Sequence, residues 1–273
     1  MSGSFVHYYI TAARYALLEQ IRNRFALVLL LVFVPTWYYT GYAFTTEDPV
    51  AFKFRVTDAF LDVNRRHVAY LSLGLNAITL IIGFMFFAST RKNVRFDHRL
   101  ILCGYPQPVL ILAKLTSLLL VAVVISFYTT MVLAAYWHPL SLPTVWLGFF
   151  CLTLAYGGLG LLLGVLVSCE LEGFFLIIMI SLIDTFIQNP SGNALADKDV
   201  VKAFPAFAPM QIAVAGGFTH VVPGTYILFS LAWFVGFALL GLAVFVYKTR
   251  ARKVHTCFIA EPVQLPPDDL ASQ

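Results

Sequence analysis

Asp184 is the ionisable residue that stands deepest inside an apolar run of this sequence. An intramembrane carboxylate is a functional candidate by default, because an isolated charge is costly there. Asp184 also lies near the end of its run, four residues before Gln188, so its carboxylate could simply reach water. Both interpretations stay open from the sequence.

The remaining reactive side chains form no catalytic constellation. The sequence has no GxxxxGK[ST] phosphate loop, no HExxH and no GxSxG motif. His138 and His220 stand alone, and the four cysteines show no CxxC spacing that would suggest a zinc or redox site. We therefore expect a protein that is not an enzyme and that binds no metal or cofactor directly.

The composition explains where such a chain would act. Of the 273 residues, 60 % are hydrophobic and 12 % are charged. Soluble domains average about 45–50 % apolar and about 25 % charged, so this chain could not cover itself with polar surface. The composition excludes an ordinary soluble protein and a disordered one. It predicts an all-α, polytopic membrane protein, for which we expect no nucleic-acid partner.

Six apolar runs predict six transmembrane helices, since a span takes about 20 residues. The fifth run is short. The six runs are Phe25–Phe44, Val68–Ser89, Val109–Trp137, Pro143–Cys169, Gly173–Gln188 and Gly224–Tyr247. The fourth run carries a GxxxG pair, Gly160 and Gly164, a pattern that lets helices approach closely and serves mostly for packing within one chain.

The basic residues set the orientation. If both termini are cytoplasmic, twelve Lys and Arg residues lie inside and six outside, which is the bias that cytoplasmic loops show. Residues 249–273 then form a cytoplasmic tail, which we expect to be mostly disordered. The outer loop Thr45–His67 is long and charged and could hold a short surface helix.

In residues 1–24, apolar side chains recur with the period of a helix. This pattern predicts an amphipathic helix in the membrane interface. Val6, Tyr9, Leu17 and Ile21 recur at helical spacing, with Arg14 largely on another side. An ordinary solvated cap is the alternative.

The connection between the second and third runs, residues 90–108, predicts a short cytoplasmic helix. Phe96 and Leu100 share one face, charged residues flank them, and Gly104 and Pro106 stop the helix. A basic loop that only orients the protein would need the charges but not the apolar side chains. A helix that docks a soluble partner explains both.

The segment 190–222, before the last run, is apolar but broken by Pro205 and Pro209. It is too short and interrupted to span. It predicts a re-entrant or interfacial helix pair on the outer side, buried in protein rather than exposed to lipid.

The order of these segments resembles the membrane subunit of ABC transporters of the type-2 membrane family. In that family an interfacial elbow helix precedes span one, a charged coupling helix ending near Gly-x-Pro joins spans two and three, and an outer re-entrant hairpin precedes span six. Here Ile21–Arg24 matches the elbow exit, and Phe96–Pro106, followed by Lys114, looks like the coupling segment. Phe204–Met210 resembles the hairpin, so the resemblance covers nearly the whole chain.

The resemblance implies the permease subunit of an exporter. A separate cytosolic ATP-binding subunit would hold ATP and Mg²⁺, and a second copy or a paralogue would complete the pathway through the membrane. The expected location is the bacterial cytoplasmic membrane. Residues 25–248 would form the six-span transmembrane domain, in contact with lipid. The near absence of charge in the spans suits a hydrophobic or amphipathic cargo such as a drug, a lipid or a natural product.

The resemblance also implies roles for particular residues. Coupling to the ATPase would fall to Arg95, Phe96, Asp97, Arg99, Leu100 and Gly104. The elbow helix would use Arg14, Arg22 and Arg24. The outer gate would contain Pro205, Pro209 and Met210. Candidates for the pathway lining are Phe33, Trp37, Asn76, Thr79, Phe175, Met179 and Asp184. A stand-alone secondary transporter or channel is the alternative, and an intramembrane enzyme is a third possibility for which no converging polar residues are found.

Overall fold

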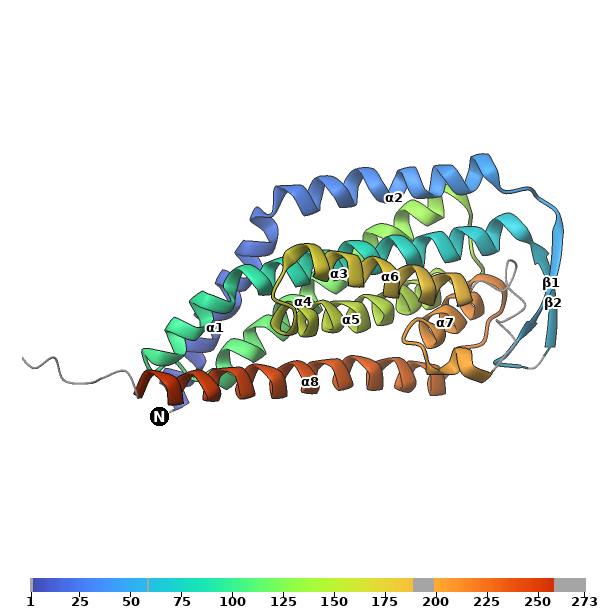
Figure 1. Ribbon diagram of the computed structural model, residues 1–273. Helices are drawn as coiled ribbons and strands as arrows, with labels where there is room; N and C mark the ends of the chain where they lie inside the picture. Colours follow the sequence, from blue (N-terminus) through green and yellow to red (C-terminus); the bar gives the residue numbers. More distant parts are fainter. Residues whose placement is uncertain (1, 58, 189–198, 258–273) are drawn as a thin grey trace, which may run out of the picture.

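The computed structural model describes residues 2–57, 59–188 and 199–257 and shows an elongated helical bundle (Figure 1). In chain order its elements are α1 (Ser2–Arg22), α2 (Arg24–Phe44), β1 (Pro49–Phe54), β2 (Ala59–Asn64), α3 (Arg65–Leu102), α4 (Gln107–Tyr136), α5 (Leu142–Leu166), α6 (Glu170–Gln188), the 3₁₀ helix η2 (Asp199–Ala203), α7 (Phe207–Phe218) and α8 (Gly224–Cys257). The start of α1 and the end of α8 lie at one end of the bundle, called here the terminal end. The β1–β2 pair lies at the other, called the hairpin end.

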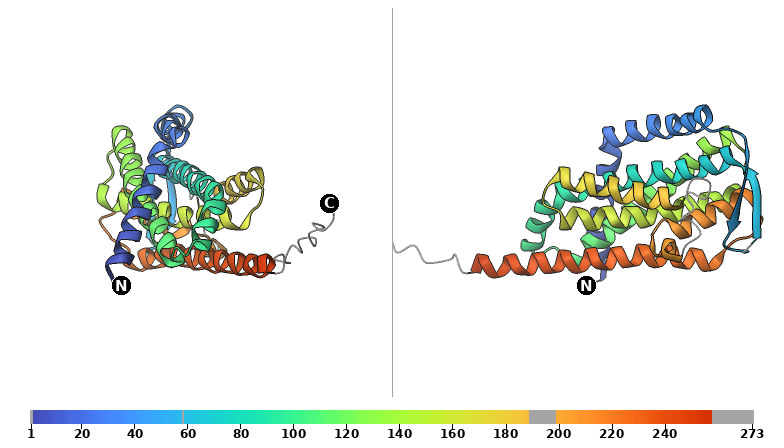
Figure 2. Two further views of the ribbon diagram at one scale, coloured as in Figure 1. Left: turned by 90° about the vertical axis from the view of Figure 1, so that its left-hand side faces the viewer. Right: turned by 45° about the vertical axis from the view of Figure 1, so that its right-hand side comes forward.

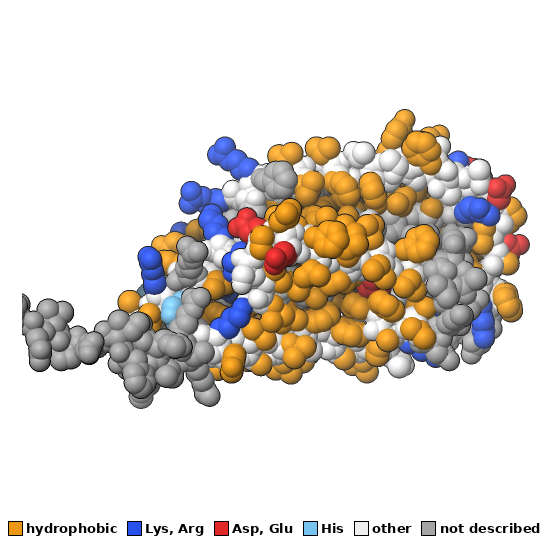
Figure 3. Space-filling model, in the orientation of Figure 1, with side chains coloured by type: hydrophobic (Ala, Val, Ile, Leu, Met, Phe, Trp, Pro, Cys, Tyr) orange, Lys and Arg blue, Asp and Glu red, His pale blue; other side chains and the backbone are white. Residues whose placement is uncertain are grey.

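Five helices among the described residues are long and apolar enough to cross a membrane, namely α2, α3, α4, α5 and α8. A band of apolar side chains covers the middle of the molecule, and basic side chains gather toward the terminal end (Figure 3). The chain is therefore a helical, multi-pass membrane protein, as its composition predicts. The short fifth run forms α6, a helix of 19 residues that is not among these five, so the six-span count stays a prediction.

Asparagine side chains start two of the long helices. Asn23 separates α1 from α2, and its side chain accepts a hydrogen bond from the backbone N–H of Ala26 at 3.2 Å. Asn64 does the same for Arg66 at the start of α3, at 2.9 Å. Each amide oxygen satisfies an N–H that has no partner within its helix. The boundary between the interfacial helix and the first span was expected after residue 24, and the structure places it at a capped break one residue earlier.

The two innermost helices, α3 and α5, pack with their backbones close together. An atom placed where a Cβ would stand on Gly160 would lie 2.7 Å from the carbonyl oxygen of Gly83. An atom at the Cβ position of Gly164 would likewise lie 2.7 Å from the Cβ atom of Thr90 on α3. The GxxxG pair thus serves packing within the chain, as its pattern suggests. The views in Figure 2 show α2 and α8 at the periphery, where much of their apolar surface stays exposed.

The segment before α8 forms a buried plug at the hairpin end. Its described part holds one α-helix, α7, preceded by the 3₁₀ turn η2, and α7 is buried along nearly its whole length. Gly148 of α5 allows the close approach, since a Cβ there would lie 2.9 Å from the carbonyl oxygen of Pro209. Burial in protein was predicted correctly. Residues 189–198 of the predicted helix pair lie outside the described residues.

The outer loop is a β-hairpin, so the expectation of a surface helix there is wrong. The strands β1 and β2 are antiparallel, with Phe52 opposite Leu61. Phe52 and Phe54 are buried while Lys53 between them is exposed. This period of two is what a half-buried strand needs, and a helix would spread these side chains around its axis.

The predicted tail also begins later than expected. The helix α8 continues through residue 249 to Cys257, because no glycine or proline interrupts the basic segment that follows the last apolar run. The rest of the tail, residues 258–273, lies outside the described residues.

Gly160→Ala is expected to destabilise the bundle. The added methyl would meet backbone atoms, which cannot rotate away, and overpacking of this kind costs about 1–3 kcal/mol. The measurement is the midpoint of thermal unfolding in a fixed detergent. The matched control is Gly236→Ala on α8, where nothing lies within 4 Å of the added Cβ. That change should leave the midpoint unchanged or raise it, and equal shifts for the two variants would contradict the packing described for α3 and α5.

Candidate functional site

The segment predicted as a separate coupling helix is the last part of α3. That helix runs for 38 residues, about 57 Å at 1.5 Å per residue, and continues past the apolar band to Leu102. The expectation of an independent short helix is therefore wrong. The reason is local, since no glycine or proline stands between Gly83 and Gly104. The predicted stop is confirmed, because Gly104 takes a positive φ of 89° and its N–H bonds back to the carbonyl of Ile101.

One face of this extension is open to solvent. Lys92, Phe96, Arg99 and Cys103 follow one another at spacings of four, three and four residues, and all four are exposed. We call these four residues the docking face. Phe96 is its apolar member, with 60 % of its surface exposed. Phe96 thus lies between two cations, Lys92 and Arg99, on one exposed face of a continuous helix. The side chain of Arg95 lies outside the described part.

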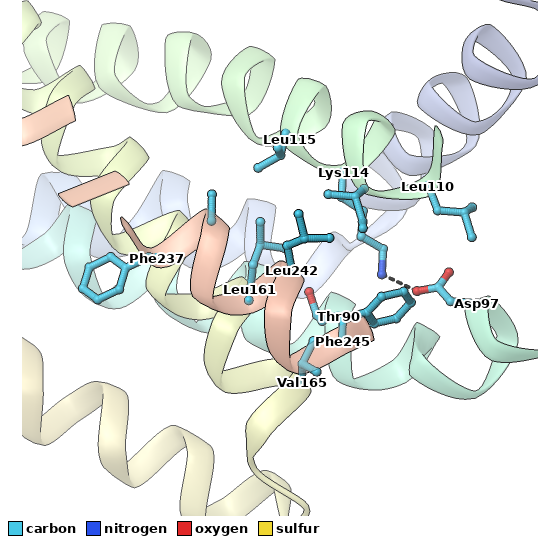
Figure 4. Close-up of a pocket in the computed structure, with 13 residues that line it drawn as sticks. Thr90, Asp97, Leu110, Lys114, Leu115, Leu161, Val165, Phe237, Leu242 and Phe245 are labelled. Carbon is cyan, nitrogen blue, oxygen red and sulfur yellow. Dashed lines mark hydrogen bonds and ion pairs between the residues drawn. The ribbon is translucent and has the colours of Figure 1, made fainter. Parts of the chain in front are cut away.

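Asp97 does not belong to that face, which corrects the role expected for it. It is only 5 % exposed and forms an ion pair with Lys114 of α4 (Figure 4). Thr90 and Phe245 lie beside the pair, around a small cavity of about 60 Å³ between α3, α4, α5 and α8. A carboxylate so enclosed needs a partner of opposite charge, so Asp97 fixes the end of α3 to α4.

Leu100 is likewise turned inward. It packs against a second apolar cluster that includes Ile101, Leu110 and Phe245. Of the two predicted apolar contacts for a partner, Phe96 is therefore exposed and Leu100 only half-buried.

The helix α1 is tied to the terminal end of α3 and α4. The hydroxyl groups of Tyr9 and Thr116 lie 2.6 Å apart, and Gln20 donates to Ser89 at 3.0 Å. Tyr105 donates to the backbone carbonyl of Tyr8 at 2.7 Å. Desolvation raises the pKa of Tyr105, with a further contribution from Tyr8, so the phenol keeps the proton that it donates.

The side chains that were expected to form one apolar face of α1 do not all point the same way. Arg14 and Arg22 are exposed on α1, whereas Arg24, which was expected on the same helix, is exposed at the start of α2. Val6 and Ile21, however, are also more than half exposed, while Tyr9 of the same predicted apolar face points toward α4. The helix thus presents one face to the bundle and leaves an apolar stripe outside, which is the arrangement expected for a helix lying in the membrane interface.

Asp184 is fully enclosed, so the interpretation that it reaches water is wrong. Tyr156 of α5 donates to its Oδ2 at 2.6 Å, and the backbone N–H of Ala206, just before α7, donates to the same oxygen at 2.9 Å. Gln188 donates to Oδ1 at 3.2 Å. The sequence offered one clue, since a carboxylate inside an apolar run must find donors, but it did not point to Tyr156.

Two other pathway candidates hydrogen-bond to α6, the helix that carries Asp184, from α3. Asn76 of α3 donates to Thr185 of α6 at 2.8 Å, and Thr79 hydrogen-bonds to Ser181. These side chains pack α3 against α6 rather than line an open space. Met179 of α6 is half-buried.

The aromatic pathway candidates are not gathered with these polar groups. Phe33 and Trp37 stack on each other on α2, with ring centroids 4.8 Å apart. Phe175 of α6 is 59 % exposed. The outer-gate candidates Pro205, Pro209 and Met210 are all buried beside or within α7. The residues predicted to line one pathway therefore lie in three separate places, namely on α2, among the buried polar contacts of α6, and on the exposed side of α6.

No protein-family model matches the sequence, and no curated protein matches it significantly. The assignment of a function accordingly rests on the geometry above and on the order of the sequence motifs.

Asp184→Leu is expected to lower the midpoint of thermal unfolding strongly. Leucine would leave the Tyr156 hydroxyl and the Ala206 N–H buried without an acceptor, and each such group costs about 1–3 kcal/mol. Asp184→Asn is the matched control. Its carbonyl oxygen can still accept from both donors, so the midpoint should fall much less. Equal destabilisation by both variants would show that the negative charge matters rather than the hydrogen-bond geometry.

Proposed function

We propose that this chain is the membrane-spanning permease subunit of an ATP-driven exporter of the type-2 ABC membrane family. The observation that carries the proposal is the docking face, an exposed phenylalanine between two cations on the end of α3 beyond the apolar band. The order of elbow helix, coupling segment and buried outer plug agrees with it. The terminal end would then be cytoplasmic and the hairpin end outside, in the bacterial cytoplasmic membrane.

The partner would be a cytosolic ATP-binding subunit that holds ATP and Mg²⁺. Its groove should be apolar where it receives Phe96 and acidic at its edges, where Lys92 and Arg99 would lie. Such complementarity favours encounter and correct orientation of the two subunits. ATP hydrolysis itself would take place on the partner.

The continuity of α3 suggests how closure of the partner would reach the far side of the membrane. Movement at Phe96 would be carried along one helix to Asn76, which is hydrogen-bonded to α6. That helix in turn contacts the residue before α7 through Asp184. A second copy or a paralogue would cover part of the exposed apolar surface of α2 or α8, and the charge-poor spans favour a hydrophobic or amphipathic cargo.

Phe96→Asp should abolish association with the ATPase, because a carboxylate would replace the apolar contact and desolvation of that charge opposes docking. The tagged full chain is purified from its native membranes, and co-purifying subunits are identified and quantified by mass spectrometry. We expect the ATPase to fall at least about tenfold, as loss of a central aromatic contact typically costs 2 kcal/mol or more.

The matched control is Phe60→Asp. Phe60 is 77 % exposed on β2 at the opposite end, so the same substitution there should leave ATPase retention unchanged. Absence of any ATPase from the wild-type preparation, or full retention by Phe96→Asp, would contradict the proposal.

A stand-alone secondary transporter or channel remains the second candidate, in which Asp184 would carry the coupling ion. The enclosed Asp184, with donors on both oxygens, favours a packing role. The purified chain in liposomes, given a proton or sodium gradient but no ATPase, should therefore transport nothing. Gradient-driven transport that Asp184→Asn abolishes would favour this second function.

A further inference from the structure

A second and larger cavity lies between α1, α3 and α4 at the terminal end. Its volume is about 370 Å³, at the lower end of the range of about 300–1,000 Å³ for ligand pockets. Thr90, Asp97 and Lys114 line both this cavity and the smaller one described above. Of the docking face, only Phe96 contributes to its lining.

Three buried polar atoms without a hydrogen-bond partner belong to residues that line this one cavity. They are Oε1 of Gln20, Oγ1 of Thr90 and Oγ of Ser117. The three residues come from three different helices and are 4 %, 3 % and 1 % exposed. Buried polar atoms nearly always have partners. Three such atoms around one space therefore point to a polar group of a ligand.

The chemistry of these atoms restricts that group. An amide oxygen such as Oε1 of Gln20 can only accept, whereas the Thr90 and Ser117 hydroxyls can accept or donate. The ligand must therefore supply N–H or O–H donors.

The charges of the lining favour a cationic head. Glu19 and Asp97 carry negative charge and Lys114 carries positive charge, so the formal sum is −1. Asn93 donates to Glu19, and Lys114 pairs with Asp97. An anionic head would meet an excess of negative charge, while an ammonium group with three N–H donors suits both the charge and the free acceptors.

The rest of the lining is apolar. Phe86, Leu110, Ala113 and Leu161 form much of it, and the cavity adjoins α1, whose outer stripe suits the membrane interface. We propose that this cavity binds the primary ammonium head of an amphipathic molecule, whose apolar body lies against Phe86 and Leu161. This inference is independent of the transport function, since it rests on the cavity alone.

The test compares primary with quaternary ammonium heads, because a quaternary head has the same charge and no N–H donor. The full chain in detergent is mixed with equal amounts of phosphatidylethanolamine and phosphatidylcholine, and the retained lipid is read by native mass spectrometry. We expect preferential retention of phosphatidylethanolamine by about tenfold. Dodecylamine and dodecyltrimethylammonium form a second pair, read by the shift in thermal unfolding, and stabilisation by dodecylamine without retention of lipid would identify a free amphiphile as the ligand.

Ser117→Ala removes one of the unpartnered hydroxyl groups and should weaken binding of the primary-amine probe about fivefold. It should not lower the unfolding midpoint without ligand, since that hydroxyl has no partner in the protein. Ser126→Ala is the matched control, on the same helix and also fully buried, but bonded to the Val123 carbonyl and outside the cavity lining. It should bind like wild type.

Thr90→Val is a second variant, since valine has nearly the same shape as threonine but no hydroxyl. We expect it to weaken binding of the primary-amine probe as much as Ser117→Ala does. Equal retention of the two lipids together with equal shifts by the two amines would overturn the proposal. So would identical binding by the Ser117→Ala and Ser126→Ala variants, since the Ser117 hydroxyl would then make no contact with the ammonium head.

Discussion

The helices α3 and α5 cross where Gly160 leaves room for the backbone of Gly83. No side chain separates them there, so dispersion contacts act between the backbones themselves, as in other membrane helix pairs with small residues. The other helices are placed relative to this pair. The helices α2 and α6 pack on α3, α7 and α8 pack on α5, and α4 contacts both. The position of the docking face follows from the same contact, because it lies on the continuation of α3.

Two buried carboxylates then fix which elements meet at the two ends. Asp97 joins α3 to α4 through Lys114 at the terminal end, and Asp184 joins α6 to α5 and to the residue before α7 at the hairpin end. An unpaired carboxylate in such surroundings would be very costly. Each therefore disfavours any arrangement of helices that leaves it without donors. Asp97 was expected to contact the partner, and Asp184 was expected either to line the pathway or to reach water; both are instead enclosed by the protein.

The docking face and the 370 Å³ cavity lie on neighbouring sides of the same helix end. Phe96 belongs to both, and α1 forms the opposite wall of the cavity. A ligand held between α1 and α3 would therefore lie next to the surface that we assign to the ATPase. The terminal end of α3 thus brings together a structural ion pair, the face that we propose for the ATPase and the cavity that we propose for an amphipathic ligand.

The sequence predicted the membrane class and the stop at Gly104 correctly, and it placed the end of the first helix at residue 24, close to the observed break at Asn23. Each of these depends on residues close together in the chain. It did not predict that the coupling segment continues α3, although the lack of a glycine or proline before Gly104 was visible. It also missed the β-hairpin, although apolar and charged side chains alternate from Phe52 to Val56.

What the sequence by itself determined is thus local, since the length of an apolar run, a capping asparagine or a helix-breaking glycine acts on its immediate neighbours. The tertiary structure alone decided which polar groups meet. Tyr156 reaches Asp184 across 28 positions of the chain, and Gln20 reaches Ser89 across 69. Such pairs depend on the crossing of whole helices. The glycines of α5 indicated that some helix would pack closely there, but only the tertiary structure shows that this helix is α3 and which side chains its position brings together.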